Sequence, residues 1–218
     1  MPLTWQMLTL AALAYLVGSI PFGLVVGRAK GIDPRTSGSG NIGATNVGRL
    51  LGGKYFALVF ALDLLKGLLP MLAAAYLLRH LPTNDKPYLL WMAVGAAAVL
   101  GHLFPLYLQF KGGKGVATSA GVVLGLWPFY TLPGIAVVGL FLLVFAITRT
   151  VSLGSIVASG GFPFMFVLIG WAMGWPVFGR QLPLLIFGTL LGWLIVWRHR
   201  GNIVRLWNGT ESSFKKPE

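Results

Sequence analysis

The stretch VATSAGVVLGLWPFYTLPGIAVVGLFLLVFAI, residues 116–147, decides how this chain is organised. It is 32 residues long and almost entirely apolar, so one helix through it would measure about 48 Å. A hydrocarbon core of about 30 Å needs only about 20 residues of helix. Trp127-Pro128 and Pro133-Gly134 lie near its middle and are typical of a turn or a membrane interface. We therefore expect two short membrane spans here.

Other apolar stretches flank this one on both sides. They cover residues 4–27, 52–78, 88–109, 151–173 and 182–197. Of the 218 residues, 56% are hydrophobic and 10% are charged, and the long apolar runs lack the alternation of barrel strands. The first run has no basic leader or cleavage signal, so it is interpreted as a retained span. The sequence thus predicts an all-α, polytopic integral membrane helical bundle of about seven transmembrane helices, forming one domain over residues 1–218.

Basic residues indicate the orientation of these spans. With the N-terminus outside, thirteen Lys and Arg residues fall on the cytoplasmic side: Arg28, Lys30, Arg35, Arg49, Lys54, Lys111, Lys114, Arg149, Arg198, Arg200, Arg205, Lys215 and Lys216. Only Arg79, Lys86 and Arg180 fall outside, and Lys66 lies within a span. The positive-inside rule therefore favours seven spans, with the C-terminus in the cytoplasm.

The composition also narrows the classes of function. The chain has no cysteine, three histidines and five acidic residues, so we expect neither a metal site nor a cofactor. The net charge of +12 is gathered in short connections between apolar segments, which is unlike a nucleic-acid interface. Anionic lipid and anionic substrates are the expected partners, and the sequence leaves the oligomeric state open.

Residues 31–49 form the first of three polar segments that are expected on the cytoplasmic face. Glycines allow a backbone to approach an anion closely, and hydroxyl and amide side chains add hydrogen-bond donors. The candidate phosphate-binding residues are Ser37, Gly38, Ser39, Gly40, Asn41, Gly43, Thr45 and Asn46. Arg49 adds a fork-shaped guanidinium. The G-x-G-x-x-G pattern within this segment is not a dinucleotide fingerprint, because a membrane helix and not a strand precedes it.

The other two polar segments are also rich in basic residues. The second has Lys111, Gly112, Gly113 and Lys114 ahead of a helix N-terminus, which is a typical anion site. In the third, Arg198, Asn202 and Arg205 would share one helix face, with His199 beside Asn202. Taken alone, the first segment is also compatible with a flexible surface loop, the second with a lysine pair that only sets the orientation, and the third with a basic anchor on anionic lipid.

Two charged residues fall inside the second apolar stretch. Asp63 and Lys66 are three residues apart, so they share a helix face. Unpaired charge is costly in a membrane. We therefore expect them to pair with each other or to face the bundle interior, in a structural and not a catalytic role.

Together the three segments resemble the bacterial acyl-phosphate:glycerol-3-phosphate acyltransferases, the PlsY family. The motifs G-S-I-P at residues 18–21, G-x-D-x-R…G-S-G-N-x-G-A-T-N-x-x-R, G-H-x-F-P…F-K-G-G-K-G-V-A-T and R-H-x-x-N-I-x-R-L-x-x-G-x-E occur in order. The resemblance implies acyl transfer from acyl phosphate to the 1-hydroxyl of glycerol 3-phosphate, giving lysophosphatidic acid and phosphate in phospholipid biosynthesis. It also implies a multi-pass protein of the bacterial inner membrane with its active site at the cytoplasmic face.

The resemblance further implies which residues act. Ser39 and the backbone of Gly40 and Asn41 would cradle phosphate. The catalytic set would be Ser39, Arg49, Lys114, His199 and Asn202. Whether Lys111 or Lys114 contacts the substrate stays open. So does the identity of the base, which is either His199 or the phosphate of glycerol 3-phosphate itself, and the preferred acyl-chain length.

Two rival interpretations remain. His80 and Asp85 fit the H-x-x-x-x-D signature of acyl-CoA-dependent acyltransferases, although the predicted topology places them outside. A transporter or flippase would also have several spans and intramembrane charge. It would, however, distribute functional charge across the bilayer, whereas here the polar residues gather on one side.

Overall fold

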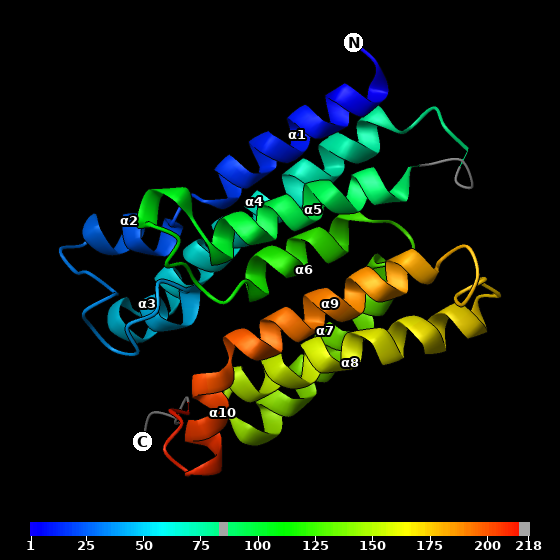
Figure 1. Ribbon diagram of the computed structural model, residues 1–218. Coiled ribbons are helices and arrows are strands. Elements are labelled where there is room, and N and C mark those ends of the chain that lie inside the picture. The colour runs from blue at the N-terminus through cyan, green and yellow to red at the C-terminus, as the bar shows by residue number, and fades with distance from the viewer. Residues whose placement is uncertain (83–86, 214–218) are drawn as a thin grey trace. The chain divides into compact units, whose positions relative to one another are not determined.

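The computed structural model describes residues 1–82 and 87–213, and within these residues it is helical with no strand. The chain divides into two compact units, Met1–Leu126 (unit 1) and Trp127–Glu218 (unit 2). Figure 1 shows the helices of each unit. The division falls at the turn expected within residues 116–147. That one domain covers the whole chain stays a prediction.

Unit 1 is built from long helices and two short ones. They are α1 (Leu3–Gly18), α2 (Phe22–Arg28), α3 (Ala44–Leu51), α4 (Gly53–Leu77), α5 (Tyr88–Leu103) and α6 (Val116–Gly125), with a 3-10 turn, η2, at Leu106–Leu108. Helices α1 and α5 lie side by side and run in the same direction (Figure 1). A Cβ atom on Gly18 would lie only 2.2 Å from the Ala98 carbonyl oxygen. Glycine thus lets the two backbones approach closely, as small residues do between membrane helices.

Helices α4 and α6 also pack through glycines. A Cβ atom on Gly67 would lie 2.1 Å from the carbonyl oxygen of Thr118, and one on Gly121 would lie 2.1 Å from that of Leu64. Larger residues would therefore push α6 away from α4. This contact holds the N-terminus of α6, which follows the second polar segment, against the middle of α4.

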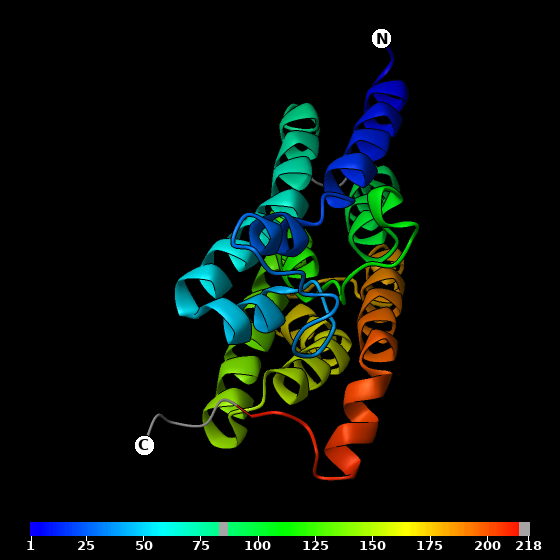
Figure 2. The ribbon, with the colours of Figure 1, turned by 90° about the vertical axis from the view of Figure 1, so that its left-hand side faces the viewer.

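The first apolar stretch is one candidate membrane span, Leu3–Arg28, as expected over residues 4–27, but it is built from two helices and not from one continuous helix. Helix α1 ends at Gly18, and α2 begins only at Phe22. Pro21 explains the interruption, because proline has no N–H to continue the helical ladder and its ring clashes with the preceding turn. After this break α2 leads into the first polar segment. Figure 2 shows that segment at the end of unit 1 that carries α2 and α3.

Unit 2 consists of three long helices and a short terminal one. They are α7 (Thr131–Thr148), α8 (Val151–Ala172), α9 (Leu182–Arg198) and α10 (Arg200–Trp207). Its core is aromatic. The Tyr130 hydroxyl donates to the Leu184 carbonyl, and the Tyr130 ring meets Phe162 and Phe166 edge-on. This arrangement buries the rings and satisfies the one hydroxyl among them.

The helix lengths test the predicted spans. In the described part of the chain, five segments are long and apolar enough to cross a membrane, or six if the bent pair α9 and α10 counts as one span. Helix α6 is shorter, so the seventh span stays a prediction. The split of residues 116–147 is confirmed, with the break between Gly125 and Thr131. Pro133 and Gly134 do not mark it: they lie in the first turn of α7, where proline is tolerated.

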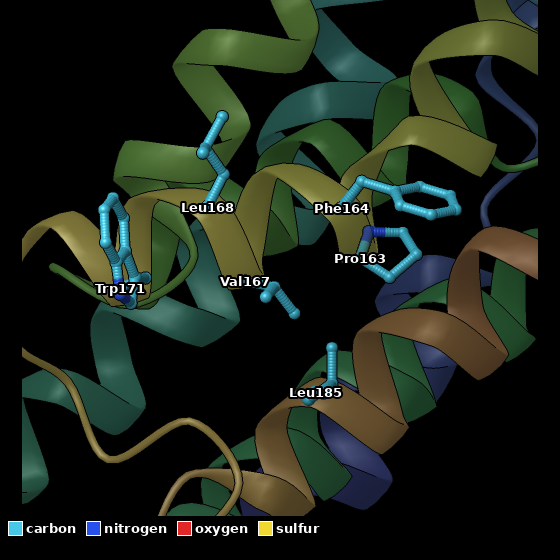
Figure 3. A pocket seen from close by; sticks show the side chains of 6 residues that line it. All are labelled: Pro163, Phe164, Val167, Leu168, Trp171 and Leu185. Atoms are coloured by element: carbon cyan, nitrogen blue, oxygen red, sulfur yellow. The ribbon is translucent and has the colours of Figure 1, made fainter.

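An apolar groove runs between α8 and α9. Figure 3 shows Val167 of α8 and Leu185 of α9 pointing toward each other across it. Its lining residues are Pro163, Phe164, Val167, Leu168, Trp171 and Leu185. None of these side chains is charged, so the groove contributes apolar surface only.

Candidate functional site

Asn46 organises the first polar segment. It lies buried in the first turn of α3, and its amide nitrogen donates to the carbonyl oxygens of Pro34, Ser37 and Asn41, at 2.9, 3.1 and 2.8 Å. Its side-chain oxygen accepts from the Ser39 N–H at 2.8 Å. One side chain therefore fixes the path of residues 34–41. The sequence did not distinguish this role from direct phosphate binding, which stays a prediction for Asn46.

The donors of this segment fall into two groups. The N–H groups of Ser39, Gly40 and Gly43 are used inside the loop, by Asn46 Oδ1, the Ser37 carbonyl and Asn41 Oδ1. By contrast, three side-chain hydroxyl groups have no hydrogen-bond partner within the described residues: those of Ser37, Ser39 and Thr45. The three hydroxyl groups are thus donors that this loop offers to a ligand, and the expected phosphate cradle from the backbone of Gly40 and Asn41 stays a prediction.

Glycine at two positions makes this loop possible. Gly38 and Gly40 have φ of 62° and 70°, which L side chains rarely adopt. A Cβ atom on Gly38 would also lie 2.3 Å from Asn46 Oδ1. Phosphate contacts of Gly38, Gly40, Asn41 and Gly43 stay predictions.

A carboxylate pairs with arginine at the start of the segment. Asp33 accepts three hydrogen bonds from the Arg35 guanidinium, at 2.6, 2.9 and 3.1 Å, and the Arg28 guanidinium lies 3.7 Å from Asp33 Oδ2. The hydrogen bonds from Arg35 hold the pKa of Asp33 well below its usual value. Arg28 and Arg35 are exposed, so the pair shapes the loop surface and not a core.

Arg49 lies in the last turn of α3, three residues beyond Asn46. This spacing places it near the same helix face as Asn46. Its side chain is exposed. The short helix therefore presents a guanidinium beside the hydroxyl-bearing loop, and its catalytic role stays a prediction.

The second polar segment, residues 110–115, follows η2 and lies between α5 and α6. The N–H groups of Gly112 and Gly113 donate to the carbonyl oxygens of Leu103 and His102, both at 3.2 Å. Gly115 has a φ of 87° and directly precedes α6. The segment is thus a tight connection that places Lys111 and Lys114 next to the N-terminus of α6, where anions are favoured.

The first two polar segments lie at the same end of unit 1. The Tyr15 hydroxyl near the end of α1 donates to the Phe104 carbonyl at the end of α5, at 2.8 Å. Beyond these adjacent helix ends, the chain reaches the first segment through α2 and the second segment through η2 (Figure 1). The structure therefore brings together, within unit 1, the loop that holds Ser39 and the loop that holds the two lysines.

The expected pairing of Asp63 with Lys66 is confirmed. Lys66 Nζ lies 2.7 Å from Asp63 Oδ1, and both side chains are almost fully buried. His102 of α5 joins them, with Nδ1 3.6 Å from the same oxygen. The sequence analysis did not assign His102 to this pair. The sequence contains little indication of this contact, because His102 reaches Asp63 only through the packing of α4 against α5.

The third segment is centred on Glu211. Its Oε1 accepts from Ser152 of α8 at 2.8 Å and from Asn202 of α10 at 2.7 Å, and its Oε2 accepts from Arg205 at 2.7 Å. Glu211 was not among the expected site residues. The sequence feature that could have drawn attention to Glu211 is the rarity of acidic residues, of which the chain has only five.

These contacts set the charge of Glu211. Burial alone would raise the pKa of its carboxyl group, but hydrogen bonds from Ser152, Asn202 and Arg205 outweigh burial and lower it. Glu211 is therefore ionised at neutral pH. It holds α10 and the following residues against α8.

His199 lies at the bend between α9 and α10. Its Nδ1 is 2.8 Å from the Ile195 carbonyl oxygen. A carbonyl can only accept, so Nδ1 carries the proton and Nε2 of a neutral ring is the basic nitrogen. Asn202 lies in the first turn of α10, with its amide nitrogen engaged by Glu211. The structure thus gathers His199, Asn202 and Arg205 within unit 2, and their contacts with substrate stay predictions.

Other candidate features contribute less. In residues 1–82 and 87–213, no three His, Cys, Asp or Glu side chains gather closely enough to hold a metal ion. His80, the histidine of the rival acyl-CoA signature, is exposed just after α4. Its partner in that signature, Asp85, lies outside the described residues.

Comparison with known proteins agrees with this arrangement. Residues 8–209 match the sequence model of the glycerol-3-phosphate acyltransferase family. The glycerol-3-phosphate acyltransferase of Geobacter sulfurreducens is 45% identical over 210 residues, which cover 95% of this chain and 97% of that protein. That of Pseudomonas putida is 45% identical over 206 residues, covering 94% and 98%.

Solved structures give the same result. The crystal structure of PlsY (YgiH), an integral membrane glycerol 3-phosphate acyltransferase, in its glycerol 3-phosphate form has 42% sequence identity and a TM-score of 0.81, covering 96% of each chain. Its lysophosphatidic acid form has 41% identity and a TM-score of 0.78. With three polar segments in the order of the family motifs, and relatives this similar over nearly its whole length, this chain belongs to the glycerol-3-phosphate acyltransferase family, the PlsY family.

Proposed function

We propose that this protein transfers a fatty acyl group from acyl phosphate to the 1-hydroxyl of glycerol 3-phosphate. The products are lysophosphatidic acid and inorganic phosphate. The observation that carries the proposal is the full-length similarity to PlsY, whose crystal forms contain glycerol 3-phosphate and lysophosphatidic acid. The hydroxyl and cationic groups of the polar segments are suited to phosphate ligands.

Acyl phosphate is proposed as the donor because the chain offers more than one group of phosphate-type donors. The loop around Ser39 and the segment with Lys111 and Lys114 are separate in sequence but lie at one end of unit 1. A donor and an acceptor that both carry phosphate would use both. The test is turnover with purified acyl phosphate against turnover with acyl-CoA. Comparable rates with acyl-CoA, in a preparation free of acyl phosphate, would reject this donor.

The proposed reaction is a displacement at the acyl carbon. The 1-hydroxyl oxygen of glycerol 3-phosphate forms a bond to that carbon, the bond from the carbon to the phosphate oxygen breaks, and phosphate leaves with the bonding electrons. The hydroxyl proton goes to the phosphate of the acceptor. Ser39, Arg49, Lys114, His199 and Asn202 then bind and orient the two substrates, and no side chain acts as the base.

Glycerol distinguishes this mechanism from one in which His199 Nε2 takes the proton. General-base catalysis contributes about 10² to 10⁴-fold in rate. Glycerol lacks the phosphate, so it should fail even at saturating concentration. We expect His199→Gln mainly to raise KM for glycerol 3-phosphate and to leave measurable kcat. Near-normal kcat with glycerol, or complete loss of kcat in His199→Gln, would favour the histidine base.

We propose a seven-span topology in the bacterial inner membrane, with the N-terminus outside and the three polar segments and the C-terminus in the cytoplasm. The distribution of basic residues supports this orientation. Because the chain has no cysteine, single cysteines report accessibility cleanly. A cysteine at Ser212 should resist an impermeant thiol reagent added to intact cells and react in opened membranes. Labelling in intact cells would rule out this topology.

We also propose that residues 1–218 act as one membrane-embedded domain. The family motifs are divided between the units, since Ser39, Arg49 and Lys114 belong to unit 1 and His199 and Asn202 to unit 2. Neither half alone contains all the proposed catalytic residues. We therefore expect residues 1–126 and 127–218, expressed separately, each to lack activity.

A further inference from the structure

A buried charged cluster in unit 1 contacts the break between α1 and α2, which leads to the first polar segment, and Gly113 of the second polar segment. We call Asp63, Lys66 and His102 the charged cluster. Lys66 Nζ lies 2.7 Å from Asp63 Oδ1, and His102 Nδ1 lies 3.6 Å from the same atom. All three side chains are at most 5% exposed. They come from α4 and α5, so the cluster joins two helices inside the unit.

Lys66 connects the cluster to the first polar segment. Its Nζ donates to the Ile20 carbonyl at 2.9 Å, in the break between α1 and α2. In a membrane protein a carbonyl released by a helix break needs a new partner. Helix α2, which follows, is held tightly against the loop: a Cβ atom on Gly23 would lie within 2 Å of the Ile42 carbonyl oxygen. Lys66 therefore fixes the point from which α2 and residues 31–43 extend.

His102 connects the cluster to the second polar segment. Its carbonyl accepts from the Gly113 N–H at 3.2 Å. Its imidazole packs against the same residue, since a Cβ atom on Gly113 would lie 2.2 Å from Nε2. Gly113 does not have a positive φ. Glycine is thus required there by the imidazole and not by the backbone conformation.

We infer that the charged cluster is a positioning device. Asp63 anchors Lys66 and His102, and these hold the loop of Ser39 and the loop of Lys111 and Lys114 in fixed positions within unit 1. This inference rests on the proposed function for its kinetic consequence. None of the three residues touches substrate. They act through the Ile20 carbonyl and through Gly113.

The cost of burying charge supports this role over a purely stabilising one. A buried ion pair adds little net stability, because desolvation offsets the attraction between its charges. Well-packed apolar residues would stabilise the contact between α4 and α5 at least as well. Instead, Lys66 Nζ donates to the Ile20 carbonyl at the helix break, and the His102 imidazole packs against Gly113 of the second polar segment. Small displacements of positioning groups can lower rates by about 10²-fold, which makes such a device consequential.

The contact between His102 and Gly113 allows a suppressor test. Gly113→Ala should push residues 110–115 away from the imidazole and raise KM for at least one phosphate substrate by about 10- to 100-fold. His102→Asn removes ring atoms where the new methyl group would lie. The double variant should therefore have a lower KM than Gly113→Ala alone, and thermal unfolding identifies any variant that fails to fold.

Gly112→Ala is the matched control for this suppression. A Cβ atom there would lie 2.1 Å from the His102 carbonyl oxygen and 2.5 Å from Pro105. These atoms remain in His102→Asn, so that variant should not rescue Gly112→Ala. His80→Asn, at an exposed histidine, controls for histidine replacement as such. Wild-type KM in Gly113→Ala, or equal rescue of Gly112→Ala and Gly113→Ala, would overturn the inference.

A second readout separates this inference from the proposed function. A single cysteine in place of the exposed Lys111 reports the position of residues 110–115 through its rate of labelling by a charged thiol reagent. We expect His102→Asn, but not His80→Asn, to change that rate severalfold. An unchanged rate would contradict the positioning role even in an active enzyme. A wild-type protein that forms no lysophosphatidic acid would contradict the proposed function and leave the labelling result valid.

Discussion

Units 1 and 2 each tie polar segments to one carboxylate, but the two carboxylates are neutralised differently. Asp63 lies inside the long helix α4, and its nearest cation, Lys66, is three residues away on the same helix. Glu211 follows the last helix and accepts hydrogen bonds from Ser152, Asn202 and Arg205, which belong to α8 and α10. A carboxylate within a membrane helix brings its own counterion, whereas one near a helix end can collect donors from several elements.

The largest expected effect comes from breaking the pair in unit 1. Lys66→Met leaves Asp63 buried without its cation, and removing one partner of a buried pair costs about 3–5 kcal/mol. Thermal unfolding in detergent measures the loss. Asp63→Asn combined with Lys66→Met removes both charges and should recover much of the stability. Equal losses in the single and double variants would show that the charge on Asp63 is not what destabilises Lys66→Met.

Removing the charge in unit 2 should have a smaller effect. Glu211→Gln keeps the shape of the side chain but weakens its hydrogen bonds to Asn202 and Arg205. Hydrogen bonds to charged groups are worth about 1.5–3 kcal/mol, and Gln retains part of this. We expect a moderate decrease in the unfolding temperature. A loss as large as that of Lys66→Met would remove the contrast between the units.

The effect of Glu211→Gln should depend on pH. The pKa of Glu211 is lower in the folded protein than its usual value of 4.5. The stabilisation from its charge is therefore fully present above pH 4.5 and is lost as the pH falls through the lower, folded value. The difference in unfolding temperature between wild type and Glu211→Gln should shrink in acid. A difference that is constant with pH would mean that the variant acts through packing.

Asp33→Asn should have the smallest effect on unfolding. Asp33 is also paired with arginine, but Arg28 and Arg35 are exposed, and exposed ion pairs contribute little to stability. We expect no measurable change in unfolding temperature, and KM for glycerol 3-phosphate reports on the loop around Asp33. A clear thermal destabilisation would show that this pair supports the fold as the other two do.

The helical membrane fold was predictable because apolar length and basic flanks are local properties of the sequence. The pairing of Asp63 with Lys66 followed from their spacing on one helix. The break before Phe22 was not predicted because residues 4–27 are mostly apolar and long enough for one span, although Gly18-Ser19-Ile20-Pro21 lies where the helix is interrupted. The roles of His102 and Glu211 depend on contacts between distant segments. Spacing along one chain does not reveal such contacts.

The sequence predicted which segments carry the candidate site, but not the hydrogen bonds that their atoms make. Ser39, Arg49 and the two lysines lie on the expected loops or at their edges. The sequence did not predict that the Ser39 N–H donates to Asn46 Oδ1 and the Gly40 N–H to the Ser37 carbonyl. Phosphate binding by this loop stays a prediction. A glycine-rich segment predicts that a backbone can turn tightly. It does not predict which acceptor its N–H groups will meet.

The most direct test of the proposed function is release of inorganic phosphate from acyl phosphate by the purified protein, measured with and without glycerol 3-phosphate. We predict that phosphate release depends on glycerol 3-phosphate and equals the lysophosphatidic acid formed, mole for mole. Ser39→Ala and Arg49→Ala should reduce both products together. Phosphate release at the same rate without the acceptor, or lysophosphatidic acid formed without phosphate, would contradict the proposal.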